Sequence, residues 1–154
     1  MDKIKALIDT NVLLDHLAHR EGFFQDAAVI FSMVDEGQLT GIVSSLSIVN
    51  CAYVLPKHYS GDAVLEQIKT MLRMFTISNV DASVLERAAS LEPYDYEDAV
   101  QYLSSLPYHP DIVITRDKKG FNDLGILVMT PAEFVNKAKN NNDIKFSEES
   151  PRAR

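Results

Sequence analysis

The chain has 154 residues, of which 15 are Lys or Arg and 22 are Asp or Glu, so its formal net charge at pH 7 is −7. A chain of this length is expected to fold as one domain with a sizeable core. Its single cysteine excludes a disulfide framework and a cysteine-based zinc cluster. The acidic balance argues against nucleic-acid binding by bulk charge.

Neither a targeting segment nor a membrane span is expected. The apolar run at the N-terminus stops at Asp9, which is too early for the hydrophobic region of a signal peptide. The longest apolar-rich stretch, residues 41–55, is interrupted by serines and Asn50. It falls short of the roughly 20 residues that cross a bilayer. We therefore expect a soluble, cytoplasmic protein without a membrane partner.

The expected elements alternate short β-rich runs with longer helical periods. In chain order they are a strand at 4–8, helices at 12–19 and 23–36, a strand at 41–44, helices from 47 to Pro56 and at 62–74, a strand at 75–77, helices after the caps Asp81 and Asp95, strands at 112–114 and 126–128, and a helix at 131–139. This alternation indicates an α/β fold with a mainly parallel sheet. We expect one domain over residues 1–139 and a polar, flexible tail over 140–154.

Carboxylates stand where two of the expected strands end. Asp9 follows the first strand and Asp117 follows the fourth. Ligands of parallel sheets bind beyond the carboxyl ends of the strands, so both carboxylates reach one crevice if these strands are neighbours. Asp98 lies in the first turn of the helix capped by Asp95, at the edge of its apolar stripe, where it is placed to face the same crevice.

Clustered carboxylates repel one another unless a cation neutralises them. Oxygen ligands without Cys or His favour a hard cation such as Mg²⁺ or Mn²⁺, and the chemistry that follows is metal-assisted phosphodiester hydrolysis. Each acid also has a simpler interpretation. Asp9 could cap the helix that follows it, Asp98 could favour the helix dipole, and Asp117 could lie in a solvated turn.

Four segments carry a family resemblance: IDTNVLLDHL, SSLSIVNCAYVL, DYEDAVQYLSSL and IVITRDKKGF. In order and spacing, over residues 4–134, they resemble the PIN domain. The resemblance implies a three-layer α/β/α sandwich around a mainly parallel sheet of about five strands. It also implies a ribonuclease that depends on Mg²⁺ or Mn²⁺. Bacterial members are often the toxin of a toxin–antitoxin pair, so a small antitoxin and a homodimer are expected partners beside the RNA substrate.

Position by position, the resemblance assigns catalysis and metal binding to Asp9, Asp98 and Asp117. It gives Asn11 and Thr115 a supporting role, as polar neighbours of these acids.

Three further side chains near these acids are ranked by geometry and charge. As a candidate acid of the site, Glu97 ranks below Asp98, since consecutive side chains of a helix point about 100° apart. Arg116 and Lys118 are expected either to contact RNA phosphates or to lie in a solvated turn.

One position departs from the family pattern. In many PIN domains the helix after the second strand carries a glutamate, and this chain has Asn50 there, which resembles a subset of bacterial PIN-like sequences. An amide ligates a metal through its carbonyl oxygen as a weak, uncharged ligand. We therefore expect Asn50→Glu to strengthen Mn²⁺ binding. The alternative function is a catalytically weak or inactive PIN-fold module that acts by binding RNA or a protein.

The remaining polar residues of the first helix receive structural interpretations. Asp15 is expected on a solvated face or at the rim of the cleft, and His16 and His19 as a partly exposed pair without a third ligand. The chain has no dinucleotide or P-loop glycine motif. An aspartyl-phosphate phosphotransferase would usually have a second acidic residue at the position of Asn11.

Overall fold

The computed structural model describes residues 3–141 and places a five-stranded parallel sheet at the centre of the protein. Its strands are β1 (Lys5–Ile8), β2 (Thr40–Ser44), β3 (Thr76–Ser78), β4 (Ile112–Ile114) and β5 (Leu127–Met129). Their spatial order is β3-β2-β1-β4-β5, and every neighbouring pair is parallel. The predicted strands agree with these bounds to within one residue.

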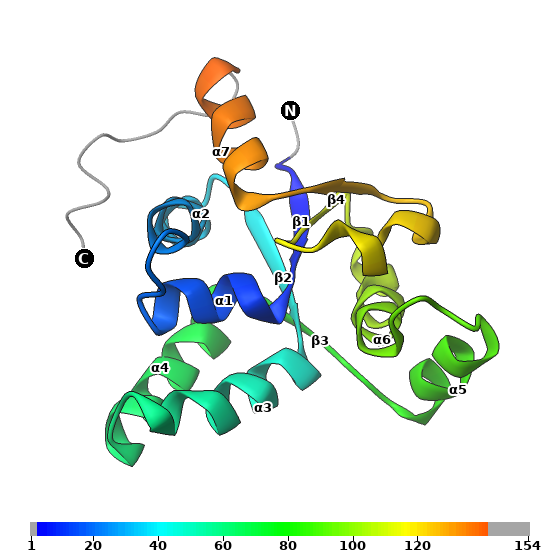
Figure 1. The fold of residues 1–154 in the computed structure, drawn as a ribbon, viewed down its shortest axis with the longest axis horizontal. Helices are drawn as coiled ribbons and strands as arrows, with labels where there is room; N and C mark the ends of the chain where they lie inside the picture. Colours follow the sequence, from blue (N-terminus) through cyan, green and yellow to red (C-terminus); the bar gives the residue numbers. More distant parts are fainter. Residues whose placement is uncertain (1–2, 142–154) are drawn as a thin grey trace.

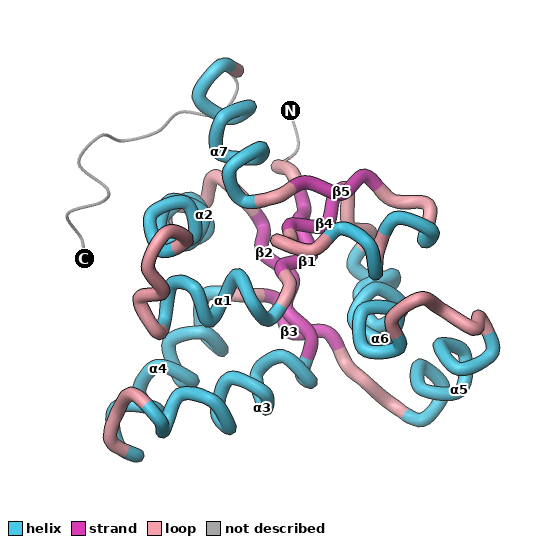
Figure 2. Tube along the Cα trace, viewed as in Figure 1, coloured by secondary structure: helices cyan, strands magenta, loops and turns pink. Residues whose placement is uncertain are grey.

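Helices cover both faces of the sheet. They are α1 (Thr10–Leu17), α2 (Phe24–Asp35), α3 (Ser45–Val54), α4 (Gly61–Met74), α5 (Ala82–Ser90), α6 (Tyr96–Ser105) and α7 (Pro131–Asn140). Short 3₁₀ turns are η1 (Leu55–Lys57), η2 (Leu106–Tyr108), η3 (Lys118–Gly120) and η4 (Asn122–Leu124). Figure 1 shows α1, α2, α3, α4 and α7 on one side of the sheet and α5 and α6 on the other. The expected three-layer α/β/α sandwich is confirmed, with the strands as the middle layer (Figure 2).

The alternation of side chains along the strands explains why the core lies on both faces. In β1, Ala6 and Ile8 join the large cluster under α1, α2, α3, α4 and α7, whereas Leu7 joins Ile42, Val113 and Phe121 on the opposite face. Successive side chains of a strand point to opposite faces, so a strand covered on both sides must be apolar throughout. This requirement accounts for the continuous apolar runs by which the strands were predicted.

Local capping chemistry fixes where the helices begin. Asp81 accepts a hydrogen bond from the Val84 N–H at 2.9 Å, so its predicted role as the cap of α5 is confirmed. Thr130 and Glu133 form a reciprocal capping box at the start of α7, which was not predicted. These caps satisfy backbone N–H groups that have no partner within a helix.

Cys51 is fully buried on α3, within the cluster that packs beneath α1 and α4. Burial raises the pKa of its thiol to about 12, against a smaller opposing effect from the positive charge of Arg20. The thiol is therefore protonated at neutral pH and acts as a small apolar side chain in the core.

Among residues 3–141, no helix is both long enough and apolar enough to cross a membrane. The predicted polar tail began at residue 140, but α7 extends to Asn140. Residues 142–154 of that tail lie outside the described residues.

Candidate functional site

The two strand ends singled out by the sequence lie side by side. β1 and β4 are parallel neighbours with Ile8 opposite Ile114. The N–H of Asp9 donates to the carbonyl of Ile114 at 3.1 Å. From β1 the next two strands, β2 and β3, are added on one side of the sheet, whereas β4 and β5 are added on the other. The order of the strands therefore switches between β1 and β4. Ligands of open α/β sheets bind beyond the strands at such a switch.

Asp9 is almost completely buried, with 6% of its surface exposed. It occupies the N-cap position of α1, but its side chain accepts no capping hydrogen bond there. Its carboxylate instead accepts from Gln101 Nε2 at 3.0 Å through Oδ1 and from Thr115 Oγ1 at 2.8 Å through Oδ2. Asp9 is therefore the N-cap residue of α1 by position, but its side chain does not cap the helix, because its oxygens bond Gln101 of α6 and Thr115 just after β4.

Asp98 lies half-buried in the first turn of α6, where its backbone N–H donates to the cap residue Asp95 at 3.0 Å. Its carboxylate lies against Gly120 of η3, so closely that a Cβ at this glycine would overlap it. Burial raises the pKa of Asp98 to about 8, and the negative charges of Asp9, Asp95, Glu97 and Asp117 add to this effect in that order. The carboxylates are thus close enough to oppose one another's ionisation.

Asp117 is the exposed member of the group and follows β4 by three residues. It caps η3, because its Oδ1 accepts from the N–H of Lys119 at 3.2 Å. Its own N–H donates to Thr115 Oγ1 at 3.2 Å, so one hydroxyl joins the backbone of Asp117 to the carboxylate of Asp9. The solvated-turn interpretation holds for the position of Asp117, and its charge nevertheless acts on Asp98.

Asn50 and Glu97 meet across the site from different helices. Asn50 on α3 donates through Nδ2 to Glu97 Oε1 of α6 at 3.2 Å. The pKa of Glu97 is raised by burial and then by the charges of Asp9 and Asp95, while the hydrogen bond from Asn50 opposes the rise. Glu97 thus lies near the site although helix geometry points its side chain about 100° from that of Asp98, because Asn50 of α3 donates a hydrogen bond to its carboxylate.

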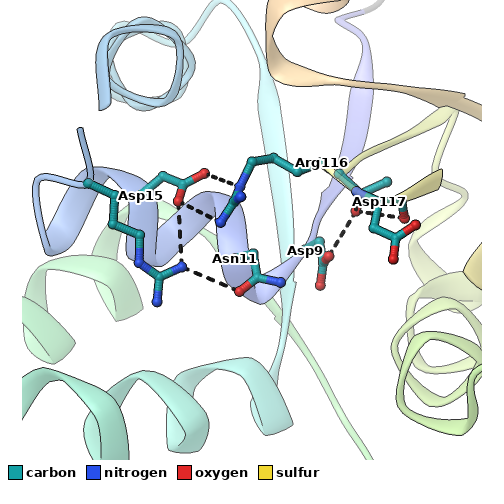
Figure 3. A network of polar contacts seen from close by, with 7 residues as sticks. Asp9, Asn11, Asp15, Arg116 and Asp117 are labelled. Carbon is teal, nitrogen blue, oxygen red and sulfur yellow. Dashed lines mark hydrogen bonds and ion pairs between the residues drawn. The ribbon is translucent and has the colours of Figure 1, made fainter. Parts of the chain in front are cut away.

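Arg116 turns away from the acidic edge and towards α1 (Figure 3). Its Nε lies 2.8 Å from Asp15 Oδ2, its Nη2 donates to Oδ1 at 3.1 Å, and its guanidinium stacks 4.0 Å from the ring centre of Phe23. Asp15 is fully buried and also pairs with Arg20 at 3.5 Å. The prediction that Asp15 lies on a solvated face or rim is wrong, because two arginines neutralise it in the interior.

The other two predicted accessory residues lie at the borders of the site. Asn11 is exposed on α1 and accepts from Arg20 Nη1 at 3.4 Å. Lys118 forms an ion pair with Glu133 of α7 at 2.6 Å and stays about one-third exposed. This pairing holds the pKa of Glu133 down, at about 2, through the hydrogen bond from Lys118 and further bonds from Thr130.

The donor set suits a hard divalent cation in its chemistry. Asp9, Asp98 and Asp117 offer only carboxylate oxygens, and their mutual repulsion would be relieved by a cation among them. As the side chains stand, no three of the His, Cys, Asp or Glu residues among positions 3–141 are grouped closely enough to hold a metal ion. Binding a cation therefore requires the carboxylates to turn towards one another.

Sequence reasoning missed Gln101, Ser47 and Gly120. Gln101 lies three residues after Asp98, so the two share a face of α6, and it stands as a polar residue inside a stretch of α6 that is otherwise apolar. That interruption was the available signal for a buried polar contact. The contact of Gly120 with Asp98 is made between a 3₁₀ turn and a helix, and no sequence pattern announces it.

Comparison with known proteins gives one family and a set of shared folds. The sequence profile described as "PIN domain" matches residues 5–119. The chain matches no curated protein.

The solved structures with a similar fold include several titled as toxins or toxin–antitoxin complexes. FitAcB from Neisseria gonorrhoeae is 16% identical, with a TM-score of 0.63 over 82% of this chain and 98% of that one. VapC20 from Mycobacterium tuberculosis, titled a sarcin–ricin loop cleaving toxin, is 12% identical, with a TM-score of 0.62 over 79% and 96%. A toxin–antitoxin complex from Klebsiella pneumoniae is 23% identical, with a TM-score of 0.59 over 82% and 97%.

At these identities the solved structures establish the fold alone, whereas the profile match covers most of the chain, from the first strand to η3. The four segments that resemble the family include the residues gathered at the carboxyl edge of the sheet. The chain belongs to the PIN-domain family.

Proposed function

We propose that the protein is a metal-dependent endoribonuclease that hydrolyses RNA phosphodiester bonds. The observation that carries the proposal is that Asp9, Asp98 and Asp117 lie at the carboxyl edge of the sheet, beside the switch in strand order between β1 and β4. The three acids come from the end of β1, the start of α6 and the loop after β4. Burial raises the pKa of Asp98, and nearby negative charges, which include those of Asp9 and Asp117, raise it further. Such an arrangement is suited to a divalent cation and a phosphate.

In this proposal the three carboxylates hold Mg²⁺ or Mn²⁺. A bound cation would lower the pKa of an attacking water and neutralise charge that develops on the phosphate oxygens. Thr115 fixes the orientation of Asp9 through its hydroxyl. Asn11 and Asn50 border the site as uncharged supporting residues.

Contacts with RNA phosphates are proposed for Lys118 and Arg116. Lys118 is the more available of the two, since its partner Glu133 is an exposed carboxylate on α7. Arg116 would contact RNA only through the edge of its guanidinium that does not face Asp15. With a net charge of −7, the protein is expected to bind bulk RNA weakly, so that selectivity comes from such local contacts.

We further propose that the protein is the toxin of a toxin–antitoxin pair in the cytoplasm, with a small antitoxin partner and a homodimeric assembly. The support is the similarity of fold to structures whose titles name toxin–antitoxin complexes and the toxin VapC20. A neighbouring reading frame that encodes a small DNA-binding protein would agree with this role.

The test is cleavage of structured and unstructured RNAs by the purified protein with Mg²⁺ or Mn²⁺. We expect cation-dependent cleavage that falls by about 100-fold or more in Asp9→Asn and in Asp117→Asn, because each variant removes one charge from the site. Asp62→Asn is the matched control, since it removes an exposed carboxylate at the start of α4.

Equal activity in the parent protein and in both site variants would contradict the site assignment. RNA binding without cleavage at any cation concentration would favour the alternative function, a PIN-fold module that acts by binding. The uncharged Asn50, bonded to Glu97, is the observation that keeps this alternative open.

A further inference from the structure

Gln101 is a fully buried amide on α6, and its side chain reaches the carboxylate of Asp9. Its Nε2 donates to Asp9 Oδ1 at 3.0 Å, and its Oε1 accepts from Ser47 Oγ of α3 at 3.3 Å. The amide thus connects α3 with the end of β1. A buried polar side chain lowers the stability of the fold unless its hydrogen bonds are made. Here both the NH₂ group and the oxygen of the amide have a hydrogen-bond partner.

The hydrogen bonds around Gln101 run in one direction, towards Asp9. An ionised carboxylate only accepts hydrogen bonds, so the NH₂ group of the amide must face Asp9 and its oxygen must face Ser47. Ser47 then donates to Gln101 and accepts from Thr10 Oγ1 at 2.7 Å or from Ser44 Oγ at 3.0 Å. Successive bonds of this kind polarise one another and fix each side chain in a single orientation.

Within residues 3–141, the side chains that donate hydrogen bonds to the Asp9 carboxylate are both uncharged. Gln101 and Thr115 each supply one hydrogen bond, one to each carboxylate oxygen. A lysine or arginine in the same place would also hold the carboxylate but would cancel its charge. Neutral donors fix the direction of Asp9 and leave its full negative charge for a cation.

We infer that Gln101 is a positioning residue for Asp9, acting through the buried hydrogen-bonded series Thr10, Ser47 and Gln101. This inference rests on the proposed cation-binding role of Asp9. Gln101 itself is too deeply buried behind Asp9 to touch substrate. Its effect is therefore on how strongly the site holds the cation and on how fast the bound RNA reacts.

The first test measures Mn²⁺ affinity by calorimetry in the parent protein, Gln101→Met and Ser47→Ala. Gln101→Met keeps the length of the side chain and removes the donor, and loss of such an outer partner weakens metal binding by about 10- to 100-fold. Ser47→Ala leaves the amide in place and frees its orientation, so a smaller loss is expected. In RNA cleavage we expect kcat to fall in both variants while KM stays within about twofold.

Ser104→Ala is the matched control. Ser104 is buried on the same helix and bonds the backbone carbonyl of Gln101 at 2.8 Å and Ser78 at 2.8 Å, without contact to Asp9. It is expected to lower stability while leaving the Mn²⁺ affinity within about twofold. Equal losses of Mn²⁺ affinity in Gln101→Met and Ser104→Ala would overturn the inference, because they would show that general loosening of α6 suffices.

A second test does not depend on cation binding or activity. In a double-mutant cycle, Asp9→Asn and Gln101→Met are combined, and urea unfolding of the four metal-free proteins gives the coupling between the two positions. We expect a coupling of at least about fivefold in the unfolding equilibrium constant, and none between Asp9→Asn and Ser104→Ala. Coupling without Mn²⁺ binding by the parent protein would retain the contact and refute the proposed function. Absence of coupling would refute the positioning role.

Discussion

Asp98 reports most directly how negative charge is balanced in the site. Its carboxyl is partly buried against Gly120 and faces four other acids, and its pKa is raised to about 8. A group whose pKa is higher in the folded protein than in the unfolded chain binds its proton more tightly after folding. The stabilisation from this proton is complete below the unfolded pKa, near 4, and is lost as the pH rises through about 8.

We therefore expect the free energy of unfolding without divalent cations to depend on pH through Asp98. Between about pH 4 and pH 8, the stability of the parent protein should fall relative to that of Asp98→Asn, whose side chain does not titrate. Saturating Mn²⁺ should reduce the fall, since a cation stabilises the ionised carboxylate. Urea unfolding at a series of pH values, with EDTA or with Mn²⁺, measures both effects.

The control for this experiment is Asp62→Asn, which removes an exposed carboxylate elsewhere and should follow the pH profile of the parent protein. Parallel curves for the parent protein and Asp98→Asn would show that Asp98 titrates as an ordinary surface acid.

Asn50 is the second residue whose substitution tests the proposed cation site, through the affinity for Mn²⁺. In the structure its amide donates to Glu97, so Asn50→Glu exchanges a donor for a carboxylate that faces another carboxylate. We expect the metal-free variant to unfold more easily and to bind Mn²⁺ about tenfold more tightly, because the added charge is relieved only by a cation. Thermal unfolding and calorimetry measure the two effects.

Asn50→Gln is the matched variant, since it keeps an uncharged amide at this position. Weaker or unchanged Mn²⁺ affinity in Asn50→Glu, beside normal affinity in Asn50→Gln, would count against a place for Asn50 in the lining of the site.

At the scale of elements, the segment that follows β4 is fastened to three parts of the fold by three successive residues. Thr115 bonds the end of β1 through Asp9, Arg116 pairs with Asp15 of α1, and Asp117 caps η3. Figure 3 shows the side chains of Arg116 and Asp117 pointing in different directions. The pair between Arg116 and Asp15 therefore joins α1 to the segment that carries Asp117.

We expect this pair to contribute to stability, because Asp15 is fully buried and Arg116 is partly buried. Arg116→Met should cost about 2–3 kcal/mol of unfolding free energy, because it leaves the fully buried Asp15 with Arg20 alone, at 3.5 Å. The double variant with Asp15→Asn should lose less than the sum of the two single variants, since no uncompensated charge remains. Urea unfolding of the four proteins measures the coupling.

The control is the pair of Lys118 with Glu133, which is more exposed and should show a much smaller coupling when tested in the same way. Additive losses for Asp15 and Arg116 would show that the pair does not act as a unit.

At the scale of the whole molecule, the layers of the fold follow from the sequence because the three central strands, β1, β2 and β4, are short, mainly apolar and buried on both faces. The edge strands β3 and β5 are less buried. The strand at Ile112–Ile114 was predicted to the residue, and the strand Thr76–Ser78 was displaced by one. An apolar run shows that a segment is buried, but hydrogen bonding to a neighbour decides where a strand begins. The turns η3 and η4 lack any apolar period and were not predicted.

The site was predictable where topology alone brings residues together. Asp9 and Asp117 follow from the rule that parallel strands present their carboxyl ends at one edge. Asp15 was misplaced because an aspartate is buried only with a partner, and its partner Arg116 lies 101 residues away. Gln101 was missed for the same reason, since its two side-chain contacts, Asp9 after β1 and Ser47 on α3, are distant in the sequence.

Because Cys51 is buried, the labelling of its thiol can be used to measure how often the helices around α3 separate. It is the only cysteine in the chain, and reagents that modify thiols attack the thiolate, which a fully buried group with a pKa of about 12 does not present. Modification must therefore wait until α3 separates from the helices packed on it. The rate of thiol labelling then measures the frequency of these openings in the unaltered protein. A cation that draws the carboxyl edge of the sheet together would lower the labelling rate before any RNA is added.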